Sequence, residues 1–219
     1  MTALSGVAKR LAFAAAGVTA GAAIFAAPSP ATASLEPDAL ERARVIRAEV
    51  DSRYRRLPGR KLRVTEATGT GVIQSLTLIT DWLDVPHVVP ADNGVYFAIC
   101  PARAKCPYPA RSAAWHAAAV LPRRQALELA LRTFLETSAT LVVVALPTAE
   151  PIWVVFQRDD LLASIDASSV LEQLVGQPAI AQTSLRDLVR TVTRPRLFLP
   201  LPILPPPEDT MYAVQLFQR

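Results

Sequence analysis

Residues 140–156 read TLVVVALPTAEPIWVVF. Two apolar runs, 141–146 and 152–156, are joined by five residues of the kind that form turns. This pattern predicts a β-hairpin. Both runs are apolar at every position, so neither face of the hairpin suits water. We therefore expect the hairpin to form the centre of a sheet that helices cover.

Two main helices are predicted before this hairpin in the sequence, over residues 37–57 and 122–138, and we expect them to cover the sheet. Apolar residues recur in both at three- and four-residue steps. The opposite side of the second helix carries charges of alternating sign at four-residue steps: Arg124, Glu128, Arg132 and Glu136. Such a ladder is typical of a solvated face with weak ion pairs along the helix. We expect these four side chains to be exposed.

Shorter elements complete the predicted domain. Residues 61–80 suit two strands or one bent strand, with a turn at Gly69-Thr70-Gly71. One strand each is expected over 94–100 and 211–218, and two short helices near 166–176 and 184–191. The segment 195–207 contains six prolines. We expect it to be extended along the body, and neither a helix nor a central strand, because proline donates no backbone hydrogen bond. The predicted fold is a single α+β domain over 34–219, with a mainly antiparallel mixed sheet of about five to six strands covered by two main helices.

The first 33 residues have the features of a secretory signal peptide. Lys9 and Arg10 precede an uncharged stretch rich in alanine, and Ala31-Thr32-Ala33 fits the pattern of a cleavage site before Ser34. An uncleaved membrane anchor is the alternative, but the 17 residues from Leu11 to Ala27 are short and only weakly apolar for a span. We predict a bacterial protein that is secreted or extracytoplasmic, with no stable transmembrane segment after cleavage. Its net charge of +4 would fall to about +2 when the peptide leaves.

The chain has two cysteines, Cys100 and Cys106. An exported protein meets an oxidising compartment, so this pair predicts a disulfide bond. The five residues between them do not match the Cys-x-x-Cys spacing of thiol oxidoreductases. We predict a structural link that closes a basic loop at the end of a strand.

Basic residues gather in two places. One run occupies 53–63, where neighbouring acids such as Asp51 or Glu66 favour a solvated helix end over a binding patch. The other lies around the predicted disulfide and at the start of the second main helix: Arg103, Lys105, Arg111, Arg123 and Arg124. We name these five residues as candidates for binding an anionic envelope polymer.

Catalytic candidates are few because the chain has only two histidines, His87 and His116. A hydrolase would have to use one of them with a nearby carboxylate such as Asp81 or Asp84. The sequence contains no Gly-x-Ser-x-Gly and no His-Glu-x-x-His motif. We predict no cofactor, no metal site and no nucleic-acid binding.

Three functions are compatible with these patterns. The first is a non-catalytic binding or structural protein of the cell envelope or extracellular space, and we favour it over an enzyme. The second is an exported hydrolase that uses His87 or His116. The third is a subunit of a larger envelope assembly, in which the Pro-rich segment and the last strand would contact a protein partner.

Overall fold

The predicted hairpin lies in the middle of the sheet. In the computed structural model, β5 (Leu141–Leu146) and β6 (Ile152–Gln157) pair antiparallel along their whole length. Both strands are interior in the strand order β1-β4-β5-β6-β7-β8-β2-β3. The structure describes residues 35–55, 63–70, 73–80, 85–100, 120–147, 152–176, 183–200 and 212–218, all within the unit Ala33–Arg219.

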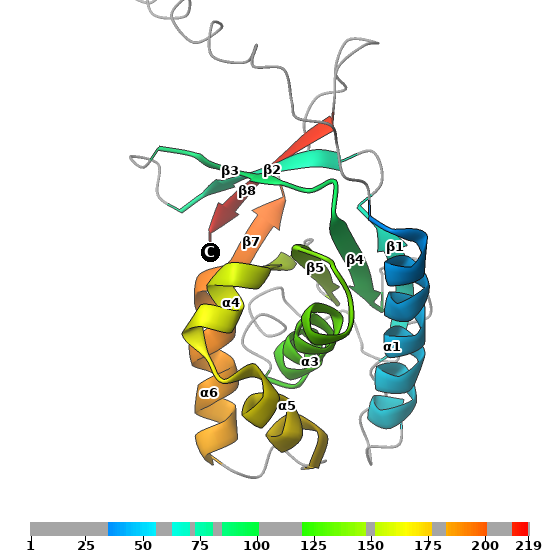
Figure 1. Cartoon of the computed structure of the whole chain (residues 1–219). Helices are drawn as coiled ribbons and strands as arrows, with labels where there is room; N and C mark the ends of the chain where they lie inside the picture. The colour runs from blue at the N-terminus through cyan, green and yellow to red at the C-terminus, as the bar shows by residue number, and fades with distance from the viewer. Residues whose placement is uncertain are drawn as a thin grey trace, which may run out of the picture. The chain divides into compact units, whose positions relative to one another are not determined.

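The described part of the sheet has eight strands (Figure 1). The pairs β4–β5 and β2–β8 are parallel, and the other five neighbouring pairs are antiparallel. The predicted α+β class with a mainly antiparallel mixed sheet is therefore confirmed. The remaining strands are β1 (Val64–Gly69), β2 (Ile73–Ile79), β3 (His87–Pro90), β4 (Gly94–Ile99), β7 (Leu197–Pro200) and β8 (Tyr212–Gln218).

The sheet has more strands than expected because β3 and β7 were not predicted. Each is four residues long and ends in a proline, which leaves no periodic signal to read. The expectation that the Pro-rich segment contains no central strand is wrong for its first residues, because β7 lies between β6 and β8. Pro195 precedes the strand and Pro200 is its last residue. The other three residues of the strand, Leu197, Phe198 and Leu199, have amide N–H groups that can bond to neighbouring strands.

Both predicted main helices are present. They are α1 (Pro37–Arg55) and α3 (Val120–Glu136). Two predicted short helices are also found, α5 (Ala167–Gly176) and α6 (Thr183–Thr193), and Asp166 Oδ1 accepts from the Ser169 amide at the start of α5, at 3.2 Å. The helix α4 (Arg158–Ser164), directly after β6, was not predicted.

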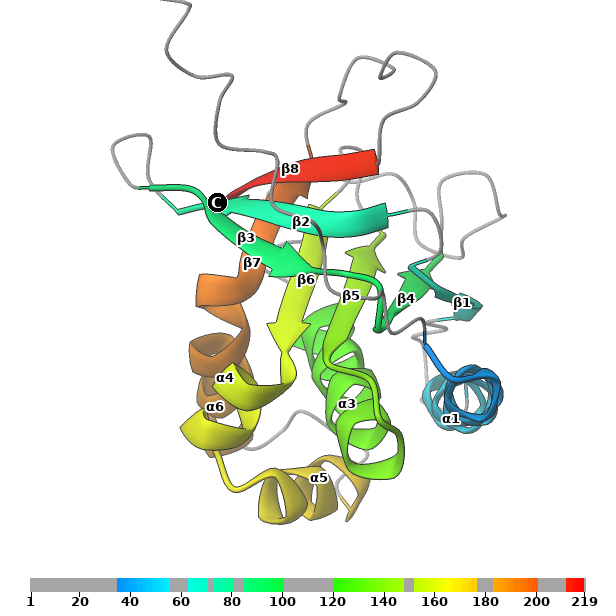
Figure 2. The ribbon, with the colours of Figure 1, turned by 45° about the horizontal axis from the view of Figure 1, so that its top comes forward.

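The central strands separate two apolar cores, because side chains alternate between the faces of a strand. On β5, Val142 and Val144 join a core shared with the helices, whereas Leu141 and Val143 join a second core. The strands β2, β3 and β8 cross over that second face (Figure 2), and Leu76 and Val89 pack there. Helices thus cover one face of the hairpin, and strands of the same sheet cover the other face.

Helix α3 is buried along almost its whole length. Every residue from Leu121 to Phe134 is buried, including Arg124, Glu128 and Arg132. The expectation that the charged side of this helix faces solvent is therefore wrong. The physical reason is that α1 packs against this side and supplies charges of its own.

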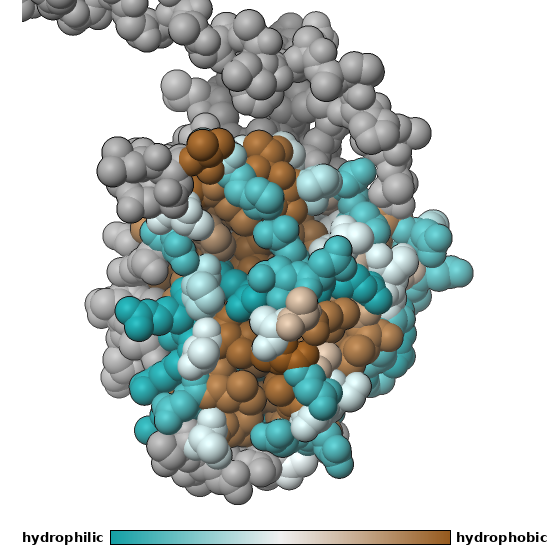
Figure 3. All heavy atoms as spheres, turned by 60° about the vertical axis from the view of Figure 1, so that its left-hand side comes forward, coloured by the Kyte–Doolittle hydropathy of each residue, from teal (hydrophilic) through white to brown (hydrophobic). Residues whose placement is uncertain are grey.

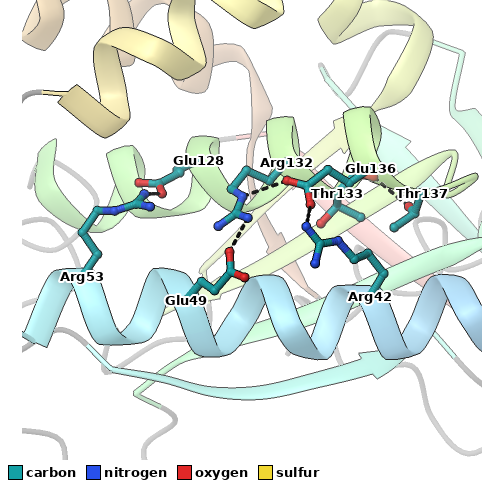
Figure 4. Close-up of polar contacts among 8 residues, drawn as sticks. All are labelled: Arg42, Glu49, Arg53, Glu128, Arg132, Thr133, Glu136 and Thr137. Carbon is teal, nitrogen blue, oxygen red and sulfur yellow. Dashed lines mark hydrogen bonds and ion pairs between the residues drawn. The ribbon is translucent and has the colours of Figure 1, made fainter.

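Charges from the two helices alternate across their interface (Figure 4). Arg53 pairs with Glu128, Glu49 with Arg132 and Arg42 with Glu136. Arg132 Nε also donates to Glu136 Oε1 along α3, at 2.9 Å, and the hydrogen bond from Arg132 lowers the pKa of the Glu49 carboxyl.

The order of these pairs makes the two helices antiparallel. A slip of α3 by one turn, four residues, would place Arg53 opposite Arg132 and Glu49 opposite an acid. Like charges at that separation repel, so the alternating signs favour the observed register over one that is shifted by a turn.

Candidate functional site

Helix α6 presents its apolar side to the protein and a row of arginines to solvent. Leu185, Val189 and Val192 are buried against the helix-covered core. On the exposed side, arginines recur at four-residue steps, which places them one above another along the helix. We call these three exposed residues the α6 arginine stripe: Arg186, Arg190 and Arg194. Arg194 opens the single 3-10 turn η1 (Arg194–Arg196) that continues α6.

The stripe differs from several other arginines of the described helices in its lack of acidic partners. Arg42, Arg53 and Arg132 are each paired with a carboxylate. Among the described residues, no carboxylate lies within ion-pair distance of any arginine of the stripe. One acid, Asp187, lies on the same exposed side of α6. The net charge of this side is therefore positive.

Arg123 extends the positive charge beneath the stripe. Its Nε donates to Thr193 Oγ1 at 2.6 Å, and its Nη2 donates to the Arg190 carbonyl at 3.0 Å. Burial lowers the pKa of the Arg123 guanidinium, and the positive charges of Arg190 and Arg194 lower it further. Together, Arg123, Arg190 and Arg194 raise the positive electrostatic potential that an approaching anion meets on this side of α6.

A structural role for part of the stripe is also clear. Cations at the carboxyl end of a helix interact favourably with its dipole, and Arg190 lies in the last turn of α6. That effect does not account for Arg186, which lies in the first half of the helix.

Figure 3 brings forward the side of the molecule that carries α6 in Figure 1, and it shows hydrophilic residues bordering a hydrophobic area.

A second polar feature is a shallow hollow of about 420 Å³ on α1, lined by Arg47, Ala48, Asp51, Ser52 and Arg55. Its charged groups already hold the protein together. Asp51 Oδ1 accepts from the Val64 amide at 2.9 Å, and Arg55 pairs with Asp51. Arg53 pairs with Glu128 in the same way. Both arginines of the basic run 53–63 that lie at the end of α1 therefore have acidic partners.

Arg123 and Arg124 are the predicted anion-binding residues that the structure describes, and both are buried. Arg124 donates to the Leu174 carbonyl and lies over the Tyr54 ring, with its guanidinium carbon 5.8 Å from the ring centroid. Both guanidinium groups thus hydrogen-bond to other parts of the protein interior. The other three candidates, Arg103, Lys105 and Arg111, lie outside the described residues.

Of the histidine and carboxylate candidates, His87 is the one that the structure describes. His87 is exposed at the start of the edge strand β3. His116, Asp81 and Asp84 lie outside the described residues. Within the described ranges, no group of three or more His, Cys, Asp or Glu is placed to hold a metal ion.

Cys100 ends β4, where the strand was predicted to lead into a closed loop. It is buried, its amide donates to the Arg63 carbonyl at 2.9 Å, and its φ of 48° turns the chain away from the strand. Cys106 lies outside the described residues, so the disulfide bond stays a prediction.

The α6 arginine stripe was missed by the sequence analysis, although its signal was present. Arg186 and Arg190 lie one helical turn apart within the predicted helix 184–191, and Arg194 follows at the same four-residue step just beyond it. The signal differs from the ladder on α3 in that its signs do not alternate.

None of the helices in the described ranges combines the length and the apolar character that a bilayer span requires. Comparisons of the chain with protein-family models, with curated proteins and with solved structures find no match.

Proposed function

We propose that this chain is an exported, non-catalytic binding protein of the cell envelope or extracellular space, and that it binds an anionic envelope polymer. The observation that carries the proposal is the α6 arginine stripe, Arg186, Arg190 and Arg194. Three exposed cations stand in one row, with no carboxylate at ion-pair distance among the described residues, so no existing ion pair has to break before they bind an anion. They are therefore available to an anion.

Neutralising two arginines of the stripe should weaken binding to an anionic glycan. The full chain with Arg186→Gln and Arg190→Gln should elute from immobilised heparin at clearly lower salt than the unmodified protein, because each exposed ion pair is lost. Glutamine keeps the helix propensity close to that of arginine.

The matched control is the full chain with Arg44→Gln and Arg63→Gln, which removes two exposed charges elsewhere on the protein. It should elute close to the unmodified protein. An equal shift in both double variants would mean that net charge alone governs retention, and the proposed site would be wrong.

The predicted export agrees with this assignment because the polymer would lie outside the cytoplasm. We expect the exported protein to begin at Ser34 and to gain two hydrogens, about 2 Da, when it is reduced. Mass spectrometry of the exported protein with and without reductant measures both quantities. Residues 1–33 retained, or two alkylatable thiols without reductant, would contradict the respective prediction.

A role as a subunit of an envelope assembly has one specific observation in its favour. Val85, which precedes the edge strand β3, is 90% exposed, and Val88 on that strand is 49% exposed. An edge strand can accept a partner. Pro86 and Pro90 flank its outer residues and limit such pairing. The Pro-rich segment and the last strand give less support for a partner, since β7 and β8 pair within the sheet. A monomer by light scattering at high protein concentration would exclude self-association through this edge.

The hydrolase alternative stays a prediction from the sequence. It requires that any hydrolytic activity of the purified protein is lost in His87→Ala or His116→Ala. Activity that survives both substitutions would remove it.

A further inference from the structure

We propose that the partner of the α6 arginine stripe is a linear polyanion that lies along the helix and contacts Arg186, Arg190 and Arg194 in succession. This inference rests on the proposed function and names the class of ligand: a chain with regularly repeated carboxylate or phosphate groups. A single anion and a flat lipid surface are the alternatives.

The geometry of a helix sets the spacing of the three cations. Four residues advance the helix by about 6 Å, so the stripe spans about 12 Å from Arg186 to Arg194. Side chains at these positions lie side by side along the axis and do not converge on one point. A single phosphate or carboxylate can contact one or two of these guanidinium groups, whereas three anionic groups in a row can contact all three.

The composition of the exposed side favours a polymer over a membrane. Amphipathic helices that lie in a bilayer surface bury their apolar side in the lipid. In α6 that side is already occupied, because Leu185, Val189 and Val192 are 2%, 0% and 5% exposed against the protein core. Among the described residues, no large hydrophobic side chain of α6 is exposed. The stripe thus offers charge without an apolar anchor.

The lone acid also fits an extended ligand. Asp187 follows Arg186 directly and lies beside the row of arginines. A sheet of phosphate headgroups would be forced against this carboxylate, whereas a narrow chain can follow the arginines and leave Asp187 in water. Each contacted arginine should add about 1.4- to 5-fold to the affinity, the range of exposed ion pairs.

The test measures binding of the full chain to oligogalacturonates of one, three and six sugars by calorimetry, at several salt concentrations. Because the hexamer gains two further arginine contacts, we expect it to bind about 2- to 25-fold more tightly than the monomer, with affinity that falls steeply as salt rises. Arg190→Gln, in the middle of the row, should weaken hexamer binding about 1.4- to 5-fold and flatten its salt dependence. Arg44→Gln should change neither.

The other outcomes separate this inference from the proposed function. Equal affinity for monomer and hexamer, lost in the variant with Arg186→Gln and Arg190→Gln, would overturn the polyanion and keep an anion site. Binding to phosphatidylglycerol vesicles without binding to the hexamer would overturn it in favour of lipid headgroups. Hexamer binding that is the same in the stripe variant and in the control with Arg44→Gln and Arg63→Gln, or no binding to any probe, would overturn both proposals.

Discussion

Replacing Arg53 by methionine should lower the free energy of unfolding by about 3 kcal/mol. Its partner Glu128 has a side chain that is 0% exposed, and Arg53 is its sole ion-pair partner among the described residues. Loss of the cation would leave a buried carboxylate without a counter-charge, a change that costs about 3–5 kcal/mol in proteins. We take the lower end because the Arg53 side chain is 31% exposed, so water can reach the site. Urea unfolding followed by circular dichroism at pH 7 measures the effect.

Two companion variants test the cause of this loss. Replacing both residues, Arg53→Met with Glu128→Leu, should recover most of the stability, because an apolar pair of similar volume often replaces a buried ion pair without loss. Arg44→Met removes an arginine from an exposed pair with Glu41 on the same helix and should change stability by less than about 1 kcal/mol. If Arg53→Met is as stable as Arg44→Met, Arg53 is not needed to stabilise the buried Glu128 carboxylate.

Replacing Phe156 by alanine should lower the free energy of unfolding by about 3–5 kcal/mol. Phe156 lies on β6 opposite Val142 and is 0% exposed in the core beneath the helices. Truncation removes the ring from this core and leaves a cavity that the central strands cannot fill by moving. The same urea experiment measures the loss.

The matched control for Phe156→Ala is Val88→Ala on the edge strand β3. Val88 is 49% exposed, so its truncation removes little buried area and should cost less than about 1 kcal/mol. Similar losses in both variants would mean that the hairpin core does not dominate the stability of the protein.

The regular parts of this fold were readable from the sequence because their periods are local. The hairpin 141–156 is marked by two apolar runs around turn residues, and the helices 37–55 and 120–136 by three- and four-residue steps. The strands β3 and β7 were not readable because four residues carry no period. Their neighbours β2, β6 and β8 make them strands through tertiary hydrogen bonds.

The charges show where local patterns fail. Arginines and glutamates at four-residue steps on α3 have the same spacing whether water or another helix faces them. The distinction lies in α1, where Glu49 and Arg53 match the signs of Arg132 and Glu128 only after the helices dock antiparallel. For the same reason Arg123 was grouped with a surface loop, although its guanidinium binds α6.

The position of β8 bears on the time at which the protein can finish folding. Leu76 of β2 pairs with Val214 of β8, and β8 also joins β2 to β7. A chain that emerges from its N-terminus first therefore presents β2 long before the strand that attaches it to the rest of the sheet, and closing so long a loop is slow. Until β8 arrives, no other strand of the described sheet joins β2 and β3 to the central strands. If the chain is exported as we propose, this delay would leave the sheet incomplete, and the chain unfolded enough to cross the membrane, until β8 has followed.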